Sequence, residues 1–132
     1  MVNFPQLSIL IVDDDENLCK ILQDSFIEEK FLSEYVLNGV DALQLLKRQS
    51  FDLVILNLNM PVLSGNEVLS IIRREIPSLP VIILSGQSTV SMVVECIKIG
   101  AVDYVTKPFD YDELLDKIIK YFNRRTNSHF AS

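Results

Sequence analysis

Carboxylates, a hydroxyl and a lysine follow the ends of short apolar runs in this sequence. Asp13, Asp14 and Asp15 come directly after the first run, Ser85 follows a later run and Lys107 follows the last. Adjacent carboxylates repel one another unless a cation lies among them, and oxygen ligands with room for water suit Mg²⁺. A lysine and a hydroxyl beside such a cation can contact an anionic oxygen group. The residue types therefore indicate a site for a divalent metal and a phosphoryl group.

Each of these residues also has an ordinary structural interpretation. Asp15 could cap a helix that begins after it, Ser85 could be a turn residue, and Lys107 could be a solvated loop lysine. The site is favoured because all of these residues follow the carboxyl ends of separate apolar runs.

Five short apolar runs have the length of β-strands. They cover Ser8–Val12, Ser33–Leu37, Leu53–Leu56, Val81–Leu84 and Asp103–Thr106. The first, third and fourth runs are continuously apolar, which is typical of strands that are buried on both faces of a parallel sheet. Helices must then cover both faces of that sheet.

Apolar residues recur at helical spacing after each run, and each set predicts one buried helix face. The five sets are Leu18, Ile21, Leu22 and Phe26; Gly39, Ala42, Leu43 and Leu46; Val68, Leu69, Ile72 and Ile76; Val90, Val93, Val94 and Ile97; and Leu114, Leu115, Ile118, Ile119 and Phe122. Gly100 follows the fourth set, where a glycine would end the helix.

This alternation predicts an α/β fold, a doubly wound, five-stranded parallel sheet of (βα)5 type with right-handed crossovers. In such sheets the functional crevice lies beyond the carboxyl ends of the strands. The polar residues described above follow those ends.

Four motifs resemble the receiver domains of two-component response regulators. They are ILIVDDDE (9–16), DLVILNLNMPVLSG (52–65), PVIILSG (80–86) and GAVDYVTKPF (100–109), in the order and spacing of that family. The resemblance implies the flavodoxin-like strand order 2-1-3-4-5. It also implies a receiver domain over residues 1–123, with 124–132 as a polar C-terminal tail or the start of a linker.

The resemblance assigns roles to individual positions. Asp13 and Asp14 match the acidic pair that holds Mg²⁺, and the backbone carbonyl of Asn59 matches a further ligand. Lys107 matches the lysine that contacts the phosphoryl group, and its bond to the following proline matches a cis peptide. Ser85 matches the hydroxyl that moves to meet the phosphoryl group.

Tyr104 matches the aromatic switch whose ring turns inward on activation. Together with Ser85, it implies a two-state element that the phosphoryl group biases. Without a phosphate acceptor, we expect the inactive arrangement of this element to dominate.

Asn57 departs from the family, which has its phosphate-accepting aspartate at this position. A carboxylate oxygen can attack a phosphohistidine, whereas a neutral amide is a poor nucleophile. We therefore expect the chain to be phosphorylation-deficient. Mg²⁺ binding should also weaken, because Asn57 removes a negative charge from the metal site.

Two explanations of Asn57 stay open. Either it was introduced to hold the domain unphosphorylated, or the parent is a natural pseudo-receiver that acts as a phosphorylation-independent interaction module. A phosphatase of the haloacid dehalogenase type is another alternative, because such enzymes also begin with an apolar strand that ends in Asp-x-Asp. That family needs a further acidic strand after Lys107, and only a helix pattern and a polar tail follow.

The partners implied by the resemblance are a sensor histidine kinase or phosphotransfer protein, and an effector domain or second receiver. The latter would bind the face made by the fourth helix, the fifth strand and the fifth helix. The charged residues there are Lys98, Asp103, Asp112, Asp116, Lys117 and Lys120, although solvated helix faces have similar charges.

Composition limits the remaining function classes. The 132 residues include 18 acidic and 12 basic side chains, a net charge of −6 that argues against nucleic-acid or anionic-membrane binding. No apolar run could cross a bilayer and no secretory signal is visible, so we expect a cytoplasmic protein. Cys19 and Cys96 lack metal-site spacing and are expected to be reduced core residues.

Overall fold

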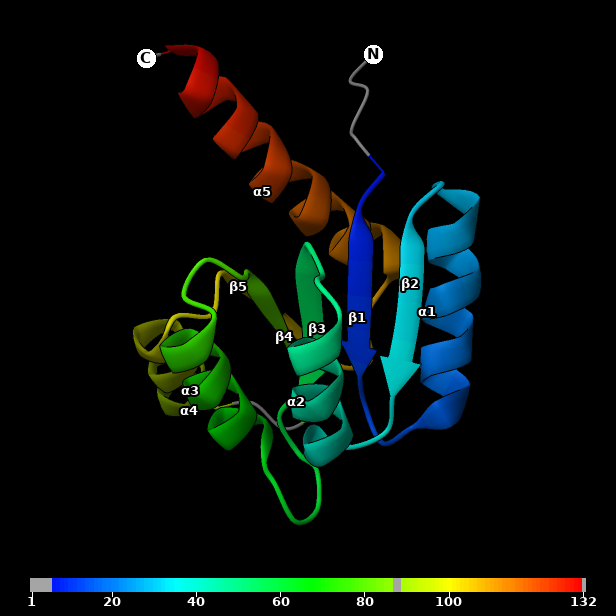
Figure 1. The fold of residues 1–132 in the computed structure, drawn as a ribbon, viewed down its shortest axis with the longest axis vertical. Helices are drawn as coiled ribbons and strands as arrows, with labels where there is room; N and C mark the ends of the chain where they lie inside the picture. The colour runs from blue at the N-terminus through cyan, green and yellow to red at the C-terminus, as the bar shows by residue number, and fades with distance from the viewer. Residues whose placement is uncertain (1–5, 87–88, 132) are drawn as a thin grey trace.

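The computed structural model describes residues 6–86 and 89–131, and the predicted alternation of strands and helices is confirmed in it (Figure 1). The strands are β1 (Ser8–Val12), β2 (Leu32–Val36), β3 (Leu53–Asn57), β4 (Val81–Ser85) and β5 (Asp103–Thr106). The helices are α1 (Glu16–Glu28), α2 (Gly39–Arg48), α3 (Gly65–Glu75), α4 (Val90–Ile99) and α5 (Tyr111–Ala131).

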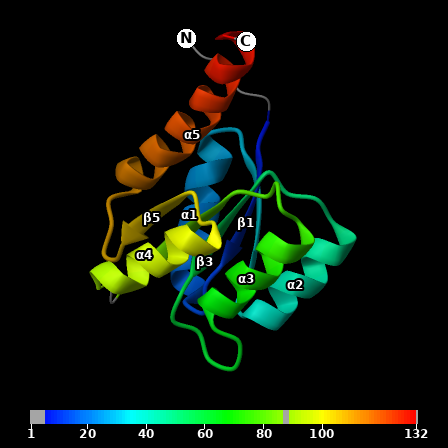
Figure 2. The same ribbon diagram turned by 90° about the vertical axis from the view of Figure 1, so that its left-hand side faces the viewer.

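All strands pair in parallel in the order β2-β1-β3-β4-β5, as the resemblance implied. Helices α1 and α5 cover one face of the sheet, while α2, α3 and α4 cover the other (Figures 1 and 2). The carboxyl ends of the five strands therefore lie along one edge, and the loops that follow them form a common rim.

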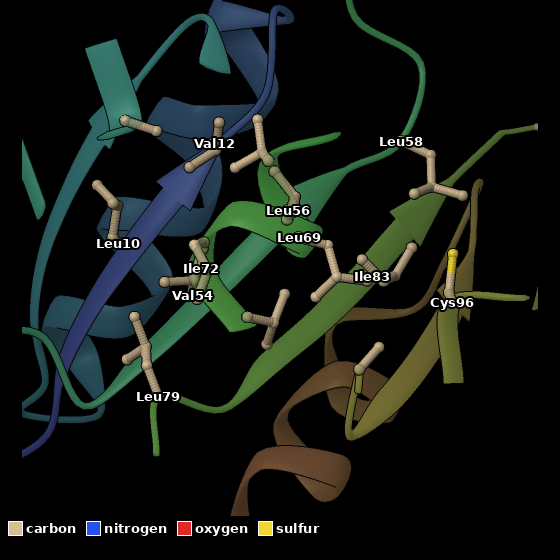
Figure 3. Packing of buried hydrophobic residues seen from close by; sticks show 14 of the residues in the cluster. Leu10, Val12, Val54, Leu56, Leu58, Leu69, Ile72, Leu79, Ile83 and Cys96 are labelled. Carbon is tan, nitrogen blue, oxygen red and sulfur yellow. The ribbon is translucent and has the colours of Figure 1, made fainter. Parts of the chain in front are cut away.

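The core is divided into two layers by the sheet. Side chains alternate along each strand, so that Leu10 and Val12 of β1 face α2 and α3, while Ile9 and Ile11 face α1 and α5. Figure 3 shows the first of these layers, where Leu69 and Ile72 of α3 pack with residues of β1, β3 and β4. Burial of both faces explains why β1, β3 and β4 are continuously apolar.

Three strands differ from the prediction by one residue. β3 and β4 each extend one residue further than predicted, to Asn57 and Ser85. β2 begins at Leu32 and ends at Val36, one residue earlier than the predicted Ser33–Leu37. It is an edge strand and no residue in it is fully buried, so its apolar pattern is a weaker guide to its ends.

The predicted buried face of α4 is wrong. Val90, Val94 and Ile97 are 81%, 43% and 46% exposed, and the helix instead buries Cys96, with Met92 packed beside it. Nearly every side of this helix is apolar, so periodicity alone could not select the face that the sheet covers.

Helix α1 contains a smaller error of the same kind. Ile21 was placed on the buried face but is 62% exposed, and Cys19 is buried together with Leu22 and Phe26.

Helix α5 continues through the segment that was predicted as a tail. Its backbone is helical to Ala131, so no break in secondary structure marks a boundary at residue 123. At the end of α4, Gly100 has the positive φ of 129° that favours glycine, as predicted. Within the described residues, none of the helices is long and apolar enough to span a bilayer.

Candidate functional site

The predicted site residues meet at the rim formed by the carboxyl ends of the strands. Asn57 and Ser85 are the last residues of β3 and β4, and Asp13 and Lys107 directly follow β1 and β5. Backbone hydrogen bonds continue the sheet pattern past the strand ends, with the Lys107 amide donating to the Ser85 carbonyl at 2.8 Å. Residues from four separate strands are thereby held at one place.

Asp13 and Lys107 form a partly buried ion pair at the centre of this rim. The Lys107 Nζ lies 2.7 Å from Asp13 Oδ2, and the Asp13 side chain has no exposed surface. Burial raises the pKa of the Asp13 carboxyl above its ordinary value, while the hydrogen bond from Lys107 and that from the Asp15 backbone oppose this rise. Lys107 is therefore a counter-charge of a buried carboxylate rather than a solvated loop residue.

The Asn57 amide lies among the acidic residues and donates to three oxygens. Its Nδ2 is 3.4 Å from Asp13 Oδ1, 3.2 Å from Asp14 Oδ1 and 3.0 Å from the carbonyl oxygen of Asn59. The Asn57 side chain is only 3% exposed. A buried hydrogen-bond donor thus lies among these three oxygens.

Three other predicted residues lie around this centre. Ser85 is fully buried at the end of β4, whereas Asp14 and Asn59 are exposed at the rim.

Asp15 caps α1, because its side chain accepts a hydrogen bond from the Leu18 backbone amide at 3.2 Å. The ordinary interpretation of Asp15 is therefore the correct one.

Gly65 positions the site, and the sequence analysis gave it no role. It begins α3 directly above the end of β3, and a Cβ atom here would lie 2.4 Å from the Asn57 carbonyl oxygen and 2.6 Å from Leu58 Cα. Only glycine allows this approach of α3 to the strand that presents Asn57. Its signal in the sequence is the Ser64-x-x-Glu67 capping box, which marks the first residue of that helix.

Tyr104 lies on β5, away from the acidic centre. Its ring packs against the core layer under α3 and α4, and its hydroxyl is buried without a hydrogen-bond partner. The ring therefore points into this layer and not into solvent.

Comparison with known families decides the relationship of this chain. The model of the response regulator receiver domain matches residues 9–119, which include every site residue described above. The chain belongs to this family. Receiver domains are signalling modules of two-component systems, and the flavodoxin-like fold found here is theirs.

Curated relatives of this receiver domain include longer proteins. It is 39% identical over 109 residues to the transcriptional regulatory protein ZraR of Klebsiella oxytoca, which covers 83% of this chain and 25% of that protein. It is 33% identical over 124 residues to PcoR of Escherichia coli, covering 94% of this chain and 54% of PcoR. The chain thus spans about a quarter of ZraR and about half of PcoR.

Solved structures agree with the fold. The receiver domain of the Francisella response regulator 1452 has a TM-score of 0.85 at 31% identity, over 91% of this chain and 99% of that one. The BeF3-activated DrrB receiver domain has a TM-score of 0.82 at 30% identity, over 90% and 99%.

Receiver domains generally bind Mg²⁺ at this rim, so the local residues can be tested against that ion. Three oxygens converge here, from Asp13, Asp14 and Asn59, which suits a hard cation. The atom that faces them is the Asn57 Nδ2, however, and an N–H donor in this orientation cannot be a metal ligand. As arranged, the site fits the amide and not a bound Mg²⁺.

Proposed function

We propose that this receiver domain works without phosphorylation, as a protein-interaction module of a two-component system. The observation that carries the proposal is the Asn57 amide at the acceptor position, where a carboxylate would be needed to form an acyl phosphate. Ser85 and Lys107 hold the places of the hydroxyl and the lysine of a phosphoryl-accepting pocket. In this chain they surround a group that is not a nucleophile.

The partner face that we propose consists of α4, β5 and α5. Val90, Val94 and Ile97 expose apolar surface along α4. Lys117 pairs with Asp103 at 3.0 Å and Lys120 with Asp116 at 3.0 Å, so part of the charge of this face is neutralised within it. An effector domain or a second receiver would bury this apolar surface with little cost from unpaired charge.

A second surface lies beside the pocket and suits a sensor histidine kinase or phosphotransfer protein. A groove of about 540 Å³ runs between α1 and the loop after β5, and its lining includes Ile21, Lys107 and Phe109. The groove is next to the pocket because Lys107 belongs to both. We propose that the groove is a docking surface, and that the chain acts in the cytoplasm without binding nucleic acid or membranes.

Two origins of Asn57 are compatible with this function. In one, Asn57 replaces an aspartate of an otherwise competent receiver, and in the other the parent is a natural pseudo-receiver. The identity of codon 57 in the parent gene separates them. A phosphatase of the haloacid dehalogenase type is not proposed again, because the family match covers the chain to residue 119.

The test of this function is incubation with acetyl phosphate and Mg²⁺, followed by intact-mass measurement. We expect no phosphoryl adduct on this chain and one adduct on the Asn57→Asp variant, whose pocket otherwise stays the same. The double variant Asn57→Asp, Lys107→Ala is the matched control and should lose most of that labelling. An adduct on the unaltered chain would overturn the proposal of phosphorylation deficiency, and an inert Asn57→Asp variant would favour a natural pseudo-receiver.

A further inference from the structure

The oxygens around Asn57 would require a positive group if Asn57 did not supply one. Asp13 and Asp14 bring two negative charges and Lys107 brings one positive charge, so the acidic pair retains one uncompensated charge. Lys107 reaches Asp13 Oδ2 only, at 2.7 Å. Asp13 Oδ1 accepts from the Asp15 backbone amide at 3.0 Å and, more weakly, from Asn57 Nδ2 at 3.4 Å. Asp14 Oδ1 and the Asn59 carbonyl also face Asn57 Nδ2.

The direction of the Asn57 amide follows from this arrangement. Its Nδ2 carries two N–H groups and has only acceptors within reach, at 3.0 to 3.4 Å. If the amide were turned over, its Oδ1 would meet the same three oxygens with no proton between them. Turning the amide over therefore costs these hydrogen bonds, and a cation among the oxygens would offset that cost.

The amide also ties together segments that are distant in the sequence. Asp13 and Asp14 belong to the loop after β1, and Asn59 belongs to the loop after β3. Lys107 extends the same network to the loop after β5, across 94 positions of sequence. A continuous chain of hydrogen bonds thus connects three of the rim's loops.

We propose that the Asn57 amide takes the structural place of a bound cation, so that this pocket is complete without metal. The two N–H groups supply the positive ends that a divalent ion would supply to a set of carboxylates. Mg²⁺ can then bind only after the amide turns its Oδ1 toward the ion and gives up its hydrogen bonds. The inference concerns the pocket alone and does not depend on what signals reach the domain.

The experiment compares three side chains at position 57 in the whole chain. Asn57 has a donor and an amide oxygen, Asn57→Asp has only acceptors, and Asn57→Ala has neither. Thermal unfolding is followed by circular dichroism in EDTA and in MgCl₂, with NaCl held at equal ionic strength.

In EDTA, we expect Asn57→Asp to unfold at a lower temperature than the unaltered chain, because four oxygens then converge without a donor. In MgCl₂, Asn57→Asp should recover, while the unaltered chain should shift little. The apparent Mg²⁺ dissociation constant of the unaltered chain should be higher by about tenfold or more, since it lacks one ligand charge. Asn57→Ala should be less stable than the unaltered chain in EDTA, which assigns the effect to the lost donor.

A second measurement uses the unaltered chain and does not depend on the variants folding. The side-chain amide protons of Asn57, assigned by NMR, should exchange slowly with solvent in EDTA because they are buried and hydrogen-bonded. Rapid exchange of these protons in EDTA would overturn the proposal. So would an equal rise of the unfolding temperature with MgCl₂ in the unaltered chain and in Asn57→Asp.

Discussion

The pocket and the α4-β5-α5 face of this receiver domain differ in how their polar groups are satisfied. In the pocket, Asp13 and Asn57 are buried and Lys107 is partly exposed, and all three have hydrogen-bond partners. On the α4-β5-α5 face, the buried hydroxyl of Tyr104 has none, and α4 exposes apolar residues. The polar groups of the pocket thus have partners within the chain. On the face, a partner could bury the exposed apolar residues of α4, while the Tyr104 hydroxyl could gain a partner only if its ring rearranged.

In a phosphorylated receiver, the position of the Tyr104 ring would be connected to the state of the pocket. The resemblance implies that Tyr104 turns inward when the pocket is phosphorylated, yet its hydroxyl is already buried beside a pocket that has no acceptor carboxylate. Combining Tyr104→Phe with Asn57→Asp tests whether the ring position depends on the pocket.

The largest effect is expected from Gly65→Ala, which acts on the backbone that supports the pocket. The new Cβ would meet the Asn57 carbonyl oxygen at 2.4 Å and Leu58 Cα at 2.6 Å, and backbone atoms cannot move aside easily. We expect a loss of about 3 kcal/mol in the free energy of unfolding, measured with urea. Gly86→Ala is the matched control at the same rim, because nothing lies within 4 Å of its Cβ position. Equal losses in the two variants would show that the close approach of α3 is not required.

Gly65 also shows where sequence reasoning stops. Continuous apolar runs were enough to place β1, β3 and β4, since a strand buried on both faces has no other pattern. The closeness of Gly65 to Asn57 depends on how α3 sits against the end of β3, and no spacing within either segment encodes it. The position of Gly65 in the capping box marked only where the helix begins.

Dependence on the assembled fold also explains which other site and core residues could be predicted from the sequence. Functional groups in such sheets gather beyond the strand ends, and this rule correctly predicted that Asp13, Ser85 and Lys107 lie at one rim. The contact between Asp13 and Lys107 spans 94 positions and is a property of the assembled sheet. On α4, the neighbouring elements decide which apolar side is covered, so Val90 and Cys96 could not be distinguished by their hydrophobicity.

Lys107→Met should produce the next largest effect, because Lys107 is the only cation among the described residues that pairs with the fully buried Asp13. Lys107 is 23% exposed and water can reach the vacated place, so we expect a loss of about 2 kcal/mol rather than that of a fully buried pair. Lys120→Met on the other face breaks an exposed pair with Asp116, and the loss should be at most about 0.5 kcal/mol. Urea unfolding at neutral pH measures both. If the two losses were equal, the pocket pair would be no more important than a surface pair.

The pH dependence of the free energy of unfolding tests whether the Cys19 thiol is buried. Cys19 lies beneath the pocket, with its Sγ 3.4 Å from the Asp13 carbonyl oxygen. Burial, with the nearby charges of Asp13 and Asp15, raises the pKa of the Cys19 thiol from 9.0 to about 12. The unfolded chain loses the thiol proton near pH 9, while the folded chain keeps it. The contribution of Cys19 to the free energy of unfolding is therefore fully present below pH 9 and is lost as the pH rises toward 12.

We therefore expect the free energy of unfolding to fall by about 1.3 kcal/mol more between pH 8 and 10 in the unaltered chain than in Cys19→Ala. The variant also leaves a cavity, but a cavity shifts stability at every pH and does not change the slope. Identical slopes in the two proteins would mean that the Cys19 thiol titrates as it does in water.

The smallest effect is expected from Tyr104→Phe, and it has the opposite sign. Removing a buried hydroxyl that has no partner relieves its desolvation cost, so the variant should be more stable by about 1 kcal/mol in urea unfolding. Tyr35→Phe is the control, because the Tyr35 hydroxyl donates to exposed Glu16 at 3.1 Å and its loss should leave stability nearly unchanged. If the ring pointed outward, its hydroxyl would be in water, and Tyr104→Phe would then give no gain in stability.

The gain in stability from Tyr104→Phe should also be the same in the Asn57→Asp background, since distant sites without shared partners act additively. A gain that depended on the side chain at position 57 would show that pocket and switch are coupled even without a phosphoryl group.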